Sequence, residues 1–262
     1  MKVAAFSGAD LTYRIDGAES GPPVVFVNSL GTDYRLWDKL IPLLPAGLRL
    51  IRFDKRGHGL STCPEPPFTM GALIADLEQL LDHLGVTGAV IVGCSIGGMI
   101  AQGLAVKRLD QVRAMVLSNT GAKIGTTGMW ADRIAAVETG GVEALADTIL
   151  ERWFSTKFRA TPELSAWRAM LTRTPKDGYI GCSAAIANTD FYTTTASLTL
   201  PTLAIAGSED GSTPPDLVRE TAALVKGSRF ELIRGAGHLP MVEAPERYAE
   251  ILNRFLQDIG HH

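Results

Sequence analysis

Cysteine is scarce in this sequence of 262 residues, which contains only Cys63, Cys94 and Cys182. The three lie far apart, so none has a partner at the short spacing that zinc and iron–sulfur sites require. An odd number also argues against the disulfide framework of a small secreted domain. We therefore expect reduced thiols in a cytoplasmic protein, and no metal site.

An excess of positive charge is missing as well. The 25 lysines and arginines are balanced by 28 aspartates and glutamates, for a net charge of -3 at pH 7. A chain without a basic surface has no field to attract nucleic acid or an anionic membrane. We expect a small-molecule ligand, and neither nucleic acid nor a membrane as a partner.

Long uncharged runs are limited to residues 88–106, "GAVIVGCSIGGMIAQGLAV". The run approaches the length of a membrane-spanning helix. Its glycines, and the change from β-branched residues to alanine and glutamine midway, favour a buried strand, a tight turn and a buried helix instead. The apolar part of "MKVAAFSGADL" at the start is too short for a signal peptide.

Short apolar runs alternate with helical patterns along most of the chain. Such near-continuous runs are typical of parallel strands that are covered on both faces. A leading hairpin is predicted over 2–6 and 11–15, and strands over 23–28, 48–54, 89–93, 113–119, 201–207 and 229–235.

Two helices are well marked between these strands. One apolar stripe runs from Met70 to Leu84 and has Thr69 as a cap, and another helix starts at Pro245. Strand–helix alternation after a single hairpin predicts a mostly parallel, doubly wound α/β sheet with helices on both faces.

The alternation stops between about residues 121 and 192, where the pattern is helical. Three of the four tryptophans, Trp130, Trp153 and Trp167, lie in this stretch. We predict a core of residues 1–121 and 193–262, and a helical cap of residues 122–192 over one edge of the sheet.

The segment "GCSIG", residues 93–97, fits the pattern G-x-S-x-G between a strand and a helix. In that context the serine lies at the tip of a sharp turn, and the glycines let the neighbouring backbone pack closely. A phosphate-binding loop fits less well, because no lysine is near and Ser95 stands where a dinucleotide fingerprint needs glycine. We predict that Ser95 is a nucleophile.

A serine nucleophile needs a base, and His238 is the best placed of the histidines. It lies in "GAGHLP" after the last strand, where a loop can reach across the carboxyl edge of the sheet. His58, in "DKRGHGLS", more simply braces its turn with a hydrogen bond, and His83 lies beside the apolar stripe of a surface helix.

An acid is needed to orient the histidine, and "GSEDG" follows the strand 201–207. We prefer Asp210 over Glu209, because it lies further along the loop. The chain order is then Ser95, Asp210, His238.

The motifs "GCSIGG", "GSEDGSTPP" and "GAGHLPMVEAPE", with the hairpin and the helical insertion, resemble the α/β-hydrolase superfamily over the whole chain. The resemblance implies an eight-stranded, mostly parallel sheet with a helical cap. More narrowly, "VNSLGTDYRLWD", "RFDKRGHGLS" and "ERWF" resemble the β-ketoadipate enol-lactone hydrolases (3-oxoadipate enol-lactonases) of aromatic-compound breakdown. By resemblance, the backbone N–H groups of Leu30 and Ile96 form the oxyanion hole.

The resemblance implies hydrolysis of an enol-lactone through an acyl-enzyme, with no metal or organic cofactor. The family's substrate carries a carboxylate, for which we expect Arg133 as the cationic partner and Trp153 as a neighbour in the pocket. A general carboxylesterase or a cofactor-free perhydrolase fits the same motifs, and a small-molecule receptor that retains the triad fits less well.

Overall fold

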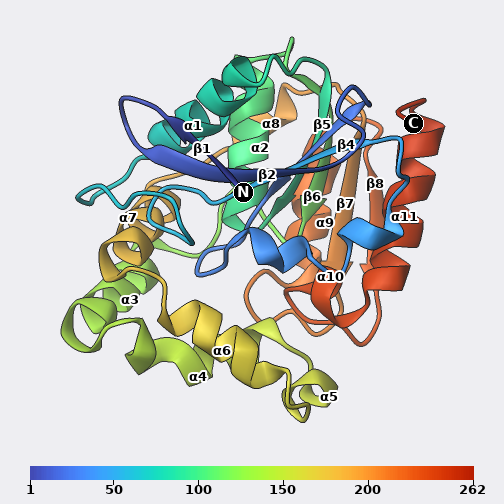
Figure 1. Cartoon of the computed structure of the whole chain (residues 1–262). Helices are drawn as coiled ribbons and strands as arrows, with labels where there is room; N and C mark the ends of the chain where they lie inside the picture. Colours follow the sequence, from blue (N-terminus) through green and yellow to red (C-terminus); the bar gives the residue numbers. More distant parts are fainter.

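The protein folds around one eight-stranded sheet (Figure 1), in a computed structural model that describes residues 1–262. The strand order is β1-β2-β4-β3-β5-β6-β7-β8, and only the hairpin β1–β2 and the pair β2–β4 are antiparallel. This confirms the predicted mostly parallel sheet. The strands are β1 Lys2–Ala5, β2 Asp10–Gly17, β3 Pro23–Val27, β4 Arg49–Phe53, β5 Ala89–Cys94, β6 Val112–Ser118, β7 Thr202–Gly207 and β8 Arg229–Ile233.

The central strand β5 is buried along its whole length, between β3 and β6. Its side chains point alternately to the two faces of the sheet, so burial of every residue means that both faces are covered. This explains why the strand appears in the sequence as an unbroken apolar run.

Two groups of helices cover these faces. The first comprises α1 Met70–His83, α2 Ile96–Lys107, α8 Tyr192–Ala196 and α9 Pro215–Leu224, which contact one another in a row. The second comprises the short helices η1 Tyr34–Trp37, η2 Ile41–Leu43 and α10 Pro240–Glu243 with the C-terminal helix α11 Pro245–Asp258. Thr69 caps α1 by accepting a hydrogen bond from the Ala72 N–H, as its sequence predicts.

Further helices lie between β6 and β7 in the chain and form a separate layer at one end of the sheet (Figure 1). Aromatic residues hold this layer together: Phe154 stacks on Phe158 with ring centroids 4.4 Å apart and contacts Trp167 at 5.9 Å. The helices are α3 Thr127–Gly140, η3 Val142–Leu145, α4 Ala146–Trp153, α5 Thr156–Arg159, α6 Leu164–Thr172 and α7 Lys176–Ala187.

The uncharged run 88–106 divides into β5, a turn and α2. No helix of the protein combines the length and the apolar character that crossing a membrane requires.

Candidate active site

Ser95 lies at the turn between β5 and α2 in a strained backbone conformation, with φ 57° and ψ -120°. The motif glycines permit this turn. A Cβ on Gly93 would lie 2.3 Å from the Gly97 carbonyl oxygen, and one on Gly97 would lie 2.1 Å from the Val27 oxygen. Both separations are shorter than van der Waals contact, so any larger residue would force the turn open. The structure thus contains the strand–turn–helix geometry of a nucleophile elbow.

His238 and Asp210 meet at the carboxyl edge of the sheet, on the segments that follow β8 and β7. The His238 Nδ1 lies 2.9 Å from an Asp210 carboxylate oxygen, and both side chains are buried. A backbone hydrogen bond of 2.7 Å from the His238 N–H to the Trp153 carbonyl anchors the histidine from the cap side.

Several donors converge on the Asp210 carboxylate. One oxygen accepts the N–H groups of Ser212 and Thr213, at 2.7 and 3.0 Å. The other accepts the Asn119 amide at 2.9 Å and the Thr213 hydroxyl at 2.7 Å. Burial by itself would raise the pKa of Asp210, but the charge and hydrogen bond of His238 and these donors lower it below its ordinary value. The acid is therefore ionised at neutral pH and able to orient the imidazole.

Glu209, the alternative acid, is exposed and makes no hydrogen bond with the histidine. Its carboxylate accepts only a weak hydrogen bond of 3.4 Å from the Thr156 N–H.

Ser95 and His238 line the same cavity, but no hydrogen bond joins the Ser95 hydroxyl to the imidazole. The His238 Nε2 instead lies 3.5 Å from the Ser29 hydroxyl. Catalytic hydrogen bonds are often long before substrate binds, and they tighten in the reacting complex. The structure therefore places His238 against Asp210 and Ser95 on the wall of the same cavity.

Leu30 and Ile96 each present a free backbone N–H near Ser95. The Leu30 N–H has no acceptor within the protein, and Leu30 lines the cavity. Ile96 is the first residue of α2, where an N–H has no carbonyl one turn earlier to donate to. Two such donors beside one serine are what an oxyanion hole requires.

The loop that carries Leu30 is braced by side chains from its neighbours. The Asn28 amide donates to the Phe53 carbonyl at 2.8 Å and accepts from the Trp37 indole at 2.8 Å. The Gly31 N–H donates to the His58 Nε2 at 3.0 Å, which is the bracing role that its sequence suggested.

The cap contributes two arginines, Arg133 and Arg152, to the cavity that holds Ser95. The Arg133 guanidinium lies 5.1 Å from the centre of the Trp130 ring, and Arg152 donates to the Gly211 carbonyl at 2.8 Å. Neither has a carboxylate partner. Burial and the neighbouring Arg133 lower the pKa of Arg152, and the charge of Asp210 opposes them only in part. Two half-buried cations without a counter-ion form a site suited to an anion.

Two other cap cations have partners of their own. Arg168 pairs with Glu143 and Asp147, and Lys176 donates to the Glu138 carbonyl. Trp153 lines the cavity, where its sequence predicted it.

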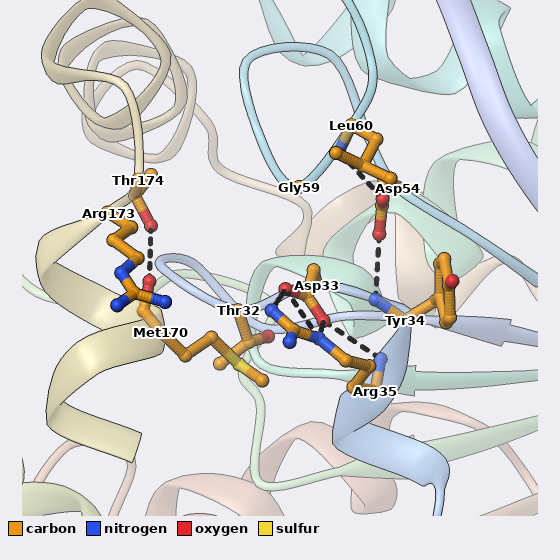
Figure 2. Close-up of a pocket in the computed structure, with 10 residues that line it drawn as sticks. All are labelled: Thr32, Asp33, Tyr34, Arg35, Asp54, Gly59, Leu60, Met170, Arg173 and Thr174. Atoms are coloured by element: carbon orange, nitrogen blue, oxygen red, sulfur yellow. Dashed lines mark hydrogen bonds and ion pairs between the residues drawn. The ribbon is translucent and has the colours of Figure 1, made fainter. Parts of the chain in front are cut away.

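A second pocket of about 340 Å³, larger than the cavity above Ser95, lies between the 32–35 loop, the 54–60 turn and α6 (Figure 2). Its acids are already engaged. Asp54 accepts the N–H groups of Tyr34 and Leu60, at 2.7 and 2.9 Å, and Asp33 pairs with Arg35 (Figure 2). No serine, cysteine or histidine lines this pocket, so it lacks the serine and histidine that share the cavity above Ser95.

The sequence alone did not single out three residues of the site: Asn119, Thr213 and Arg152. Asn119 directly follows β6, at φ 48°, and its position just after the carboxyl end of a strand is a signal that could have been used. Arg152 is one of eight lysines and arginines in the cap, and nothing in its local sequence distinguishes it from the others.

The chain belongs to the alpha/beta hydrolase family, which its sequence matches over residues 24–251. Together with the serine at the elbow, membership indicates an enzyme that hydrolyses ester bonds.

Similar proteins agree with this class. The sequence is 34% identical to a 3-oxoadipate enol-lactonase of Acinetobacter baylyi over 96% of this chain and 95% of that protein. The structure superposes on an enol-lactonase from Burkholderia xenovorans LB400 with a TM-score of 0.94 and 33% identity, covering 98% and 100% of the two chains. A hydrolase from Pseudomonas aeruginosa gives a TM-score of 0.93 at 37% identity, covering 97% of each chain.

Proposed function

We propose that this protein opens an enol-lactone that carries a carboxylate arm, converting β-ketoadipate enol-lactone to β-ketoadipate in the cytoplasmic breakdown of aromatic compounds. The observation that carries the proposal is the pair Arg133 and Arg152, which lack a counter-ion and line the cavity of Ser95 and His238. The enol-lactonases among its relatives support the choice of substrate.

The reaction begins when His238 accepts the Ser95 proton and the serine oxygen attacks the lactone carbonyl. The N–H groups of Leu30 and Ile96 stabilise the tetrahedral oxyanion, and each such donor contributes roughly 3–4 kcal/mol. Collapse breaks the ring C–O bond. The enol oxygen leaves with the proton from His238, and tautomerisation to the ketone disfavours reclosure.

Water completes the cycle. His238 removes a proton from a water molecule, which attacks the acyl-enzyme at the same carbonyl. The second tetrahedral intermediate expels the serine, which recovers its proton from His238. Asp210 stabilises the imidazolium in both halves of the reaction.

The arginines position the lactone so that its carbonyl lies within reach of Ser95. A carboxylate arm bound by Arg133 and Arg152 holds the ring carbonyl near Ser95, and the aromatic wall of Trp130 and Trp153 contacts the ring. A neutral ester makes no use of these cations, which distinguishes an enol-lactonase from a general carboxylesterase of the same fold.

The proposal is tested by steady-state assays on enol-lactones that bear or lack the carboxylate arm, with wild type, Arg133→Ala and the control Arg173→Ala. Arg173 is an exposed cap arginine on the wall of the other pocket. We expect Arg133→Ala to raise KM for the carboxylated lactone about 10- to 100-fold and to leave the neutral lactone unchanged, because only the former loses a charge-assisted hydrogen bond. Arg173→Ala should match wild type.

Other outcomes contradict the proposal in distinct ways. Equal effects of Arg133→Ala on both lactones would refute the carboxylate site. A preference for neutral esters would indicate a carboxylesterase, and peroxide-dependent turnover a perhydrolase. If a serine-directed phosphonate failed to label Ser95, Ser95 would not be the nucleophile. Tight ligand binding without turnover would indicate a receptor.

A further inference from the structure

Lys55 is a buried lysine with no carboxylate partner. It lies just after β4 with a relative exposure of 2%, and no acidic group is within ion-pair distance of it. Its ammonium donates instead to two backbone carbonyls of one loop, Ser29 at 2.6 Å and Thr32 at 3.3 Å. A buried charge is costly unless its surroundings compensate for it, so its placement needs a reason.

The partner of Lys55 is one end of the peptide that supplies an oxyanion donor. The Ser29 carbonyl and the Leu30 N–H belong to the same planar trans peptide unit and point in opposite directions. With its oxygen held by Lys55 on the protein side, that peptide directs the Leu30 N–H away from Lys55. This N–H has no acceptor in the protein, and Leu30 lines the cavity with Ser95 and His238.

A positive charge on the carbonyl end also strengthens the donor at the other end. Hydrogen bonds in series polarise one another, and the effect is larger where the local dielectric is low. The Lys55 ammonium and the Ser29 carbonyl are both buried, so solvent does not screen their interaction.

We propose that Lys55 is a positioning residue for the oxyanion hole: its ammonium orients and polarises the Ser29–Leu30 peptide, so that the Leu30 N–H stabilises the charge that develops on the substrate. The proposal rests on the function proposed above, in which the carbonyl attacked by Ser95 receives a hydrogen bond from Leu30.

Thr32 also donates to the Ser29 carbonyl, through its hydroxyl at 2.9 Å and its N–H at 3.3 Å, but it brings no charge. The braces Asp54 and His58 act on other peptides. Asp54 holds the Tyr34 N–H (Figure 2), and His58 accepts the Gly31 N–H. Neither contacts the Ser29–Leu30 peptide, and neither brings a positive charge to it. Lys55 is therefore the residue whose charge acts directly on the donor.

The charge of Lys55 is sensitive to alkaline pH. Burial lowers its pKa to about 8, against the opposing influence of nearby acids and thiols. His58 stays neutral, because burial and then Lys55 hold its pKa well below the usual range. The titratable groups that face the ammonium are Asp33, Asp54, His58, Cys94 and Cys182. Because the ammonium form predominates below pH 8, the polarisation is present there and is lost as pH rises through that value.

The test replaces Lys55 by methionine, which keeps the length of the side chain and removes its charge, with the surface variant Lys226→Met as the control. We expect kcat to fall about 10- to 100-fold while KM changes less than about threefold, because a transition-state donor is weakened and ground-state contacts are not. In wild type, kcat should fall above about pH 8. The variant should lack this alkaline limb. Lys226→Met should match wild type in rate and pH profile.

The outcomes separate the two proposals. If Ser95→Ala is inactive but Lys55→Met keeps its kcat and its alkaline limb, only the role of Lys55 is overturned. If Ser95→Ala stays active, the proposed function itself fails. Should Lys55→Met not fold, as judged by circular dichroism, the wild-type profile decides, because a kcat that stays level to pH 10 contradicts the proposal.

Discussion

At the scale of single residues, neighbours in the sequence have very different environments. Asp210 and Glu209 are adjacent, yet Asp210 is buried against His238 and receives hydrogen bonds from Asn119 and Thr213, whereas Glu209 is exposed. The chain turns inward at Asp210 because its own carboxylate accepts the N–H groups two and three residues ahead. That local turn is what selects between the two acids.

Removing the charge of each acid separates their roles. We expect Asp210→Asn to lower kcat about 10⁴-fold, because an amide stabilises the imidazolium poorly and favours the wrong tautomer. Glu209→Gln should change kcat less than about threefold. Both are measured with the best ester or lactone substrate at saturating concentration. If Glu209→Gln lost more activity than Asp210→Asn, Glu209 and not Asp210 would be the acid.

At the scale of elements, the end of cap helix α4 is tied to both loops that carry the histidine and its acid. The Arg152 carbonyl accepts the Gly211 N–H at 3.0 Å, beside Asp210, and the Trp153 carbonyl accepts the His238 N–H. The cavity-lining side chains of α4, Arg152 and Trp153, therefore lie on the same backbone that holds the loops of His238 and Asp210.

Glu243 adds a second link between cap and core. Its carboxylate accepts the N–H groups of Gly237, at 2.7 Å, and Ser155, at 3.1 Å. This joins the histidine loop to the segment that follows α4.

Removing the Glu243 carboxylate should loosen both the histidine loop and the segment that follows α4. We expect Glu243→Gln to lower the free energy of unfolding by about 1–3 kcal/mol, because an amide cannot replace all of the charge-assisted hydrogen bonds. We also expect it to lower kcat several-fold through the mobility of His238. Urea unfolding and steady-state kinetics measure the two effects, with the exposed Glu19→Gln as control. If neither the free energy of unfolding nor kcat changed, Glu243 would not hold the histidine loop or the segment after α4.

At the scale of the whole molecule, stability comes from one core that spans the sheet and its covering helices. Ile91 is at the centre of this core, paired with Val25 and Met115 on the neighbouring strands, and is fully buried. Ser95 follows four residues later, so this fully buried strand also positions the elbow.

Shortening a side chain at this centre should destabilise the whole molecule. We expect Ile91→Ala to lower the free energy of unfolding by about 2–5 kcal/mol, since it removes buried methylene groups and leaves a cavity. Leu109→Ala, at a residue 70% exposed, should change it by less than about 0.5 kcal/mol. Chemical denaturation followed by fluorescence measures both. Equal losses would mean that the core is not organised around β5.

The architecture and the family followed from the sequence, because apolar periodicity and turn glycines act locally. The strand predicted over 229–235 ends two residues early, at Ile233, since Gly235 adopts φ 74° in the turn that follows. The sequence also nominated Ser95, Asp210 and His238, whose motifs stand at strand ends that a parallel sheet brings to one edge.

Contacts between distant segments were decided only by the tertiary structure. Arg133 and Arg152 look no different from the other cap cations until the fold leaves them without acidic partners beside Ser95. Lys55 lies in an ordinary turn sequence until the fold buries it under the Ser29–Leu30 peptide. Local sequence determines which backbone conformations form, but the environment of a charge depends on residues that are remote in the chain, and packing alone brings those together.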